Sequence, residues 1–179
     1  MGIPTLISTS TASDSSSIDI TSGIDSTYDE YMFVFTDINP ATDQAWFQFQ
    51  VNAVGESDFD EYITSTYFYA YHDEDDDPAD MVYEAGLDLA QGTSYQPLAS
   101  YLGNGADESL AGMLHLFNPA STTYVKHFYS TRNYHSFHNY TVNGFTGGYI
   151  NTTSAIDEIS FKMSSGNFDG TIKMWGVKN

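Results

Sequence analysis

The sequence predicts an all-β protein, an antiparallel β-sandwich of jelly-roll type with about nine or ten strands. Three observations lead to this fold class. Apolar residues recur with a period of two over short runs, and turn-forming residues separate these runs. Tyr, Phe, Thr and Ser are abundant, whereas Lys and Arg together number five. This composition favours pleated strands over exposed helices.

The expected strands follow one another along the chain. In EYMFVF (30–35), Tyr31, Phe33 and Phe35 alternate with other residues and share one face. Further strands are expected at 45–51, 63–71, 110–117, 123–131, 140–150, 158–163 and 170–177. Asn143-Gly144, inside the 140–150 run, is a strong signal for a type I′ hairpin turn.

Two segments fit this pattern less well. ADMVYEAGLDLA (79–90) has near-helical spacing before Gly92 and predicts at most one or two turns of helix. Ile18-Asp19-Ile20 alternates and predicts an edge strand, whereas residues 1–14 are expected to be a mobile or partner-docking arm. No repeat or linker divides the chain, so residues 1–179 are expected to form a single sandwich domain.

The charge excludes several classes of partner. Asp and Glu number 24 against five Lys and Arg, which gives a formal net charge of -19. Such a surface repels phosphate backbones and anionic lipids, so neither nucleic acid nor a membrane is an expected partner. The sequence contains no Cys, which removes disulfides and Cys-ligated zinc. The first residues lack the features of a signal peptide, so synthesis in a cytoplasm is expected.

No motif of a common catalytic class occurs in the sequence. G-x-S-x-G, H-E-x-x-H, the P-loop and the dinucleotide-binding glycine pattern are all missing. Asp58, Asp60 and Glu61 are the candidates for the paired carboxylates of a glycoside hydrolase, but chance pairs are expected among so many acids. We therefore expect that the protein is not an enzyme.

The densest run of charge is a candidate calcium site. Asp73, Asp75, Asp77 and Glu84 occupy positions one, three, five and twelve of a calcium loop. Pro78 stands at position six, where that loop requires glycine, so an EF-hand is not predicted. A looser calcium site with oxygen ligands is one interpretation, and a solvated acidic loop is the simpler one. No other cofactor is indicated.

The aromatic residues are the better functional clue, because tyrosine offers both an apolar ring and a hydroxyl to an interface or a sugar. About half of those in strands are expected to be core. The candidates for a subunit interface or for ligand stacking are Tyr67, Tyr69, Tyr71, Tyr124, Tyr134, Phe137 and Tyr140. A subunit interface is favoured over a glycan site.

Four stretches resemble a known family: IDITSGIDSTYDEY (18–31), HLFNPASTTYVKHF (115–128), NTTSAI (151–156) and GTIKMWGVK (170–178). They are similar to an uncharacterised family of virion structural proteins of marine tailed bacteriophages. The resemblance implies a place in a virion, reached after synthesis in the host cytoplasm and release by lysis. It supplies no catalytic residues.

Two functions follow as hypotheses. The first is a capsid decoration (cement) or head-associated protein that forms a symmetric homo-oligomer, preferably a trimer, and contacts other virion proteins such as the major capsid protein. The second is a receptor- or glycan-binding head of a tail or head fibre, with tyrosines and Trp46 or Trp175 as stacking surfaces.

Overall fold

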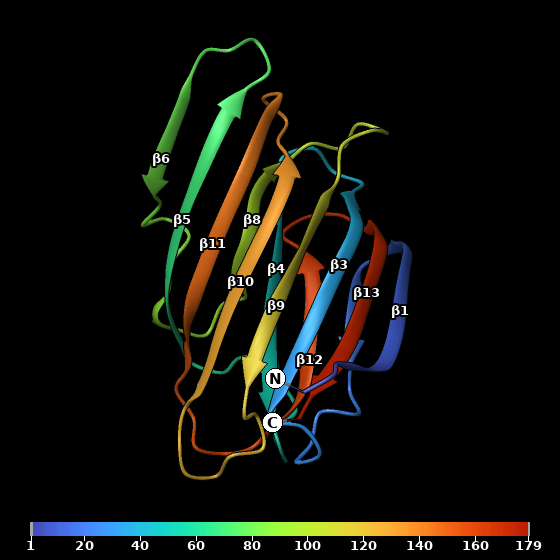
Figure 1. Ribbon diagram of the computed structural model, residues 1–179, viewed down its shortest axis with the longest axis vertical. Helices are drawn as coiled ribbons and strands as arrows, with labels where there is room; N and C mark the ends of the chain where they lie inside the picture. Colours follow the sequence, from blue (N-terminus) through green and yellow to red (C-terminus); the bar gives the residue numbers. More distant parts are fainter. Residues whose placement is uncertain (1, 179) are drawn as a thin grey trace.

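The computed structural model describes residues 2–178, which form two antiparallel sheets packed face to face (Figure 1). The larger sheet has nine strands in the order β1-β13-β3-β9-β10-β11-β5-β6, with β7 also paired to β5, and the smaller has the order β2-β12-β4-β8. The all-β sandwich predicted from the sequence is confirmed. Residues 2–178 contain no helix long and apolar enough to cross a membrane.

The described residues form thirteen strands, more than the nine or ten expected. Their bounds are β1 (Thr5–Ser15), β2 (Ser17–Ile20), β3 (Glu30–Pro40), β4 (Ala45–Ala53), β5 (Ile63–Asp73), β6 (Ala79–Tyr83), β7 (Ala90–Gly92), β8 (Gln96–Leu102), β9 (Leu110–Phe117), β10 (Lys126–His135), β11 (Tyr140–Ile150), β12 (Ile156–Met163) and β13 (Phe168–Val177).

The core lies between the two sheets, and aromatic rings from both sheets meet in it. Phe35 of β3 contacts Phe47 of β4 edge to face, with ring centroids 5.2 Å apart. Phe49 of β4 meets Phe128 of β10 in the same way at 5.1 Å. Such pairs contribute about 0.5–1.5 kcal/mol each beyond the area that they bury. The alternation predicted for 30–35 and 45–51 therefore points the expected faces inward.

Strand pairing is nested in the manner of a jelly roll: β3 pairs β13, β4 pairs β12 and β5 pairs β11. The β9–β10 hairpin is inserted between β3 and β11 and widens the large sheet. Because the small sheet has four strands, it does not cover the whole inner face of the large one. In Figure 1 the upper ends of β5, β6 and β11 extend beyond it.

Two segments differ from the expectation because they pair with open edges of the large sheet. The stretch 79–90, expected to include helix, contains β6 and ends in β7, and both pair with β5. Most of the expected N-terminal arm is β1, which pairs with β13 from Thr5 to Ser15. Met1 lies outside the described residues. An unpaired strand edge satisfies the backbone groups of any neighbouring extended segment, whatever its side-chain period.

The hairpin turn expected at Asn143-Gly144 is wrong. Both residues lie inside β11, paired with Arg132 and Asn133 of β10 and with β5 on the other side. Gly144 is required for another reason: a Cβ atom there would lie 2.7 Å from Cζ of Arg132. The glycine therefore makes room for a buried arginine.

Candidate functional site

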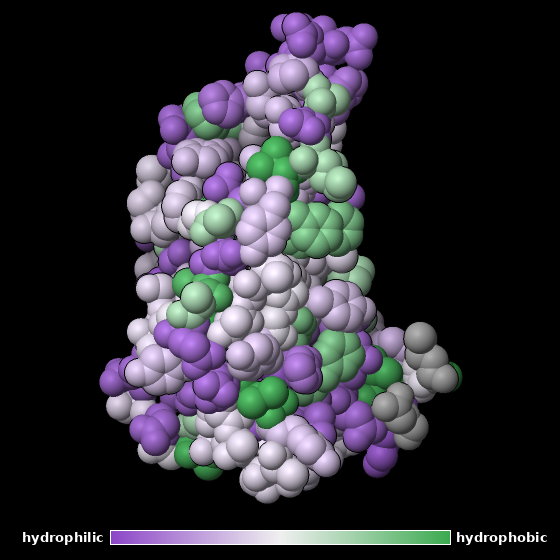
Figure 2. Space-filling view, turned by 90° about the vertical axis from the view of Figure 1, so that its left-hand side faces the viewer, coloured by the Kyte–Doolittle hydropathy of each residue, from purple (hydrophilic) through white to green (hydrophobic). Residues whose placement is uncertain are grey.

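The acidic loop forms the tip between β5 and β6, where hydrophilic groups gather at the top of Figure 2. The four residues predicted to bind calcium do not lie together in the structure. The amide of Glu84 bonds the carbonyl of Tyr67, which lies six residues before Asp73 on the same strand. That separation is about 20 Å at the rise of a β-strand. Glu84 therefore cannot join Asp73, and no group of three His, Asp or Glu residues suited to a metal occurs within residues 2–178.

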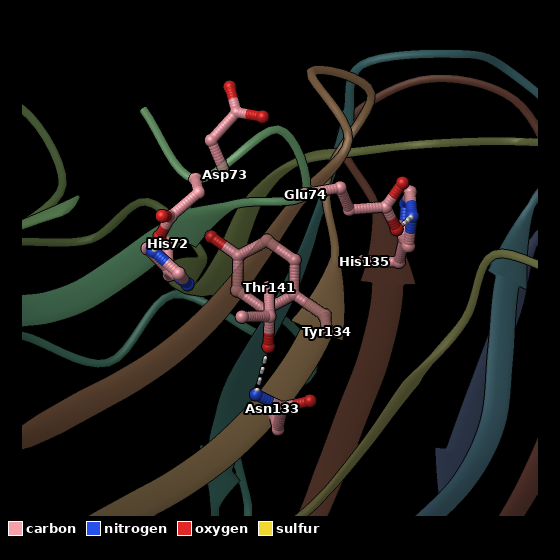
Figure 3. A pocket seen from close by; sticks show the side chains of 8 residues that line it. His72, Asp73, Glu74, Asn133, Tyr134, His135 and Thr141 are labelled. Carbon is pink, nitrogen blue, oxygen red and sulfur yellow. Dashed lines mark hydrogen bonds and ion pairs between the residues drawn. The ribbon is translucent and has the colours of Figure 1, made fainter. Parts of the chain in front are cut away.

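Behind this tip is a hollow of about 310 Å³ (Figure 3). His135 lies at one side of it beside Glu74 (Figure 3), with Nε2 placed 3.0 Å from Oε1 of Glu74 and Nδ1 placed 3.2 Å from Oε1 of Glu108. Asn133 donates a hydrogen bond to the hydroxyl of Thr141 on the floor of the hollow. Nδ1 of His135 also lies 3.0 Å from the carbonyl oxygen of Ser136. His135 therefore connects the loop of Glu74 to the loop of Glu108.

Two of the predicted contact residues are buried and offer no surface. Tyr67 is 0% exposed and Tyr134 is 3% exposed. The guanidinium of Arg132 lies over the ring of Tyr67, 4.5 Å from its centroid. Burial raises the pKa of Tyr134 far above its usual range. Both side chains stand on the inner face, where β8 covers them.

Three other predicted residues, Tyr69, Tyr71 and Tyr140, are half-buried and line a pocket of about 270 Å³. This tyrosine pocket is bordered by Tyr69, Tyr71, Val82, Tyr101, His138 and Tyr140. The rings of Tyr71 and Tyr140 are stacked at 5.2 Å. Burial raises the pKa of Tyr69, and the nearby carboxylate of Glu84 adds to this effect. The structure brings these three tyrosines together. The strand alternation predicted a shared face for Tyr69 and Tyr71, but not that Tyr140 joins them.

The remaining two candidates lie apart from one another. Phe137 is at the margin of the tyrosine pocket, where its ring contacts His138 and Tyr101. Tyr124 is 71% exposed in the loop before β10, at the opposite end of that strand. Tyr101, on the pocket wall, was not predicted from the sequence, because QPLASYL (96–102) lacks the apolar alternation of a strand.

A larger surface lies on the other side of the large sheet. We call it the outer face: the outward-pointing side chains of 30–36, 64–72, 111–117, 127–135, 141–149 and 171–175. These segments contain one of the 24 carboxylates, Glu30, whose Oε1 is hydrogen-bonded to Nδ1 of His115. Away from the end where Glu74, Asp76 and Glu108 approach His72 and His135, the outer face is therefore almost free of negative charge on a strongly acidic protein.

Aromatic side chains dominate parts of this face. Tyr129 stacks on His115 at 4.5 Å and on Phe117 at 5.6 Å. Phe68 and Phe145 stack at 5.0 Å with their planes nearly parallel. Pale green groups line the right-hand side of Figure 2, where this face is seen edge-on. Each stacked pair joins neighbouring strands and so adds cross-strand contacts to the outer face.

The outer face is hollowed near its β13 side. Pro4, Met32, Val34, Lys173 and Trp175 line a shallow depression of about 440 Å³. Trp175 is thus part of the outer face, whereas Trp46 lies at the far side of the molecule, edge to face with Tyr101. The outer face was not predicted as a site, although the missing carboxylates in these strands are visible in the sequence.

No family model and no curated protein matches the sequence.

Proposed function

We propose that the protein is a structural module of a virion surface, a decoration or head-associated protein, which assembles with copies of itself through the outer face. The observation that carries the proposal is the near-absence of carboxylates on this one face of a chain with a net charge of -19. The virion itself is what the resemblance of the sequence implies. The structure bears on how such a module would make contact.

Charge favours contact between copies at this face over contact elsewhere. Over most of the surface, two copies repel each other, and burying a carboxylate without a partner costs several kcal/mol. On the outer face Glu30 already has His115 as a partner. Contact there removes apolar and aromatic surface from water without burying an unpaired charge.

The size of the outer face suits a stable contact. Six neighbouring strands, each of eight to eleven residues, contribute to it. At about 4.8 Å between strands and about 3.3 Å per residue, it is about 25 Å in each direction. This area is of the same order as the ~800 Å² that one partner contributes to a standard interface.

The geometry also bears on symmetry. A face that packs on its own copy produces a two-fold pair, whereas a trimer needs two different complementary surfaces on each subunit. The outer face by itself favours the pair. The trimer preferred from the sequence stays a prediction, as does contact with a major capsid protein.

A single substitution tests the proposed contact. Met113 lies near the centre of the outer face, between Val34 and Thr131 of the neighbouring strands. Met113→Asp places a carboxylate there, and we expect it to weaken self-association at least tenfold in sedimentation velocity experiments. Val54→Asp is the matched control, because Val54 is an exposed apolar residue in the turn after β4.

We expect Val54→Asp to associate as the unchanged protein does, and both variants to keep its circular dichroism spectrum. Equal association of the protein and Met113→Asp would place the contact elsewhere. A protein that stays monomeric at the highest soluble concentration would exclude assembly through this face.

The virion assignment has its own test. Purified particles of the virus that encodes the chain should contain it in many symmetric copies, counted by quantitative mass spectrometry. Fewer than about a dozen copies per particle would contradict a decoration role.

A further inference from the structure

We propose that the tyrosine pocket binds a neutral saccharide, one pyranose ring at a time. This inference goes beyond the assembly role and is independent of it. The pocket lies on the inner face of β5 and β11, whereas the proposed contact uses the outer face of the same strands. A ligand in the pocket therefore leaves the outer face free.

The pocket exists because the two sheets differ in size. Tyr71 and Tyr140 lie at the ends of β5 and β11 that are next to the β5–β6 loop. These strand ends extend beyond the small sheet (Figure 1). The end of β8 closes the pocket on one side through Tyr101, and β6 closes it on the other through Val82. The volume of about 270 Å³ is slightly below that of a typical drug-sized site, which suits one ring of a longer chain.

The pocket offers both kinds of contact that a sugar needs. The apolar parts of the tyrosine rings pack against the C–H faces of a pyranose. The hydroxyls of Tyr69, Tyr71, Tyr101 and Tyr140 form no hydrogen bond with another residue among 2–178. They are therefore free to donate to and accept from the hydroxyls of a ligand.

Charge restricts the ligand to a neutral one. No Lys or Arg lines the pocket, and the chain has a net charge of -19, so a uronate, sialic acid or phosphate has no partner there. A small cation is attracted to the protein as a whole, but no Asp or Glu lines the pocket to pair with it. The lining therefore favours a hydroxyl-rich neutral ligand over a charged one.

The backbone supplies a further indication. Tyr101 has a φ of +54°, in the left-handed region that bulky residues rarely adopt. Its ring is nevertheless 48% exposed and contacts both Trp46 and Phe137. The exposed ring at the pocket rim is thus available to a ligand.

The same strain supplies a clean test. Asn tolerates a positive φ, so Tyr101→Asn removes the ring without adding backbone strain and should fold at least as well. Tyr124→Asn is the matched control, because Tyr124 is exposed at the other end of the molecule. Binding is measured by titration calorimetry and by Trp46 fluorescence in a Trp175→Phe background. The probes are maltohexaose, cellohexaose, laminarihexaose and chitohexaose, with polygalacturonate and choline as charged comparisons.

We expect at least one neutral hexasaccharide to bind, Tyr101→Asn to weaken that binding at least tenfold, and Tyr124→Asn to leave it unchanged. Binding that survives Tyr101→Asn would overturn the assignment to this pocket. Binding of choline or polygalacturonate alone would contradict a neutral saccharide as the ligand. The absence of binding by every probe at millimolar concentration would contradict a binding site in this pocket. None of these results bears on self-association, which Met113→Asp tests separately.

Discussion

At the scale of the residue, the most informative side chain is Arg132. It is 2% exposed, donates one hydrogen bond of 2.7 Å to the Thr146 hydroxyl, and lies over the ring of Tyr67. Its Nε and Nη2 atoms are buried without a partner, and each such donor costs about 1–3 kcal/mol. The sequence gives no sign of this burial, because a lone arginine among polar strand residues normally faces solvent.

A double-mutant cycle tests whether Gly144 exists to accommodate that arginine. Gly144→Ala should lower the free energy of unfolding by about 1–3 kcal/mol in the natural chain, because the three atoms nearest to the added Cβ all belong to Arg132. In an Arg132→Ala background the same change should cost little. Urea denaturation of the four proteins measures the coupling. An equal loss of unfolding free energy in both backgrounds would show that a contact other than Arg132 excludes a side chain at position 144.

Glu61 gives a prediction with a pH dependence. Burial raises its pKa, Asp60 and Glu56 add to this effect, and the opposite charge of Lys126 does not outweigh them. A carboxyl whose pKa is raised in the folded state stabilises the fold below its unfolded pKa, and this contribution is lost as the pH rises through its folded pKa. Glu61→Gln should therefore raise the melting temperature at pH 7, and the difference should shrink toward pH 4.

The control for this change is Asp58→Asn, which removes an exposed charge from the same loop. Thermal melts of both variants at pH 4 and pH 7 provide the comparison. If Glu61→Gln melts below the natural chain at pH 7, attraction to Lys126 dominates and the sign is reversed.

At the scale of the element, the long alternating strands were predictable, and so was the edge strand β2 from the alternation of Ile18-Asp19-Ile20, whereas β1, β6 and β7 were not. The expected strands at 30–35, 45–51 and 63–71 lie within β3, β4 and β5, because an apolar period of two fixes which face is buried. β1, β6 and β7 form because a neighbouring edge accepts them, which no local pattern encodes. The tyrosine row of β5 was predictable because its strand alternates with a period of two. Tyr101 was not, because no local pattern predicts its strand.

β6 should be the least stable of the strands that pair over five residues or more. It is short, lies at the edge of the sheet, and has Met81 at 72% and Tyr83 at 56% exposure. Local opening of such a strand exposes little apolar surface. Hydrogen–deuterium exchange followed by mass spectrometry should show the amides of 79–83 exchanging well before those of 110–117. Equal protection of the two segments would mean that β6 unfolds only with the whole sheet.

At the scale of the whole molecule, the charge imbalance of the surface exceeds that of the sequence. Lys126 and Arg132, two of the five basic residues, are buried. The Nζ atom of Lys126 donates to the carbonyls of Tyr124 and Thr152 at 3.1 Å and not to a carboxylate. The surface carboxylates therefore face few cations, and repulsion among them opposes both folding and assembly.

Salt should accordingly stabilise the protein. Raising NaCl from 0.1 M to 1 M shortens the Debye length from about 10 Å to about 3 Å and screens this repulsion. We expect the melting temperature to rise by several degrees, and self-association to become tighter over the same range. A melting temperature that falls with NaCl would show that ion pairs outweigh repulsion.

Assembly through the outer face is tested most directly by chemical labelling of lysines. Lys173 is exposed within the depression of that face, whereas Lys162 lies on β12 of the other sheet, over the ring of Tyr95. As the protein concentration rises through the association range, acetylation of Lys173 should fall at least several-fold while that of Lys162 stays constant. Association that leaves the labelling of Lys173 unchanged would contradict assembly through the outer face.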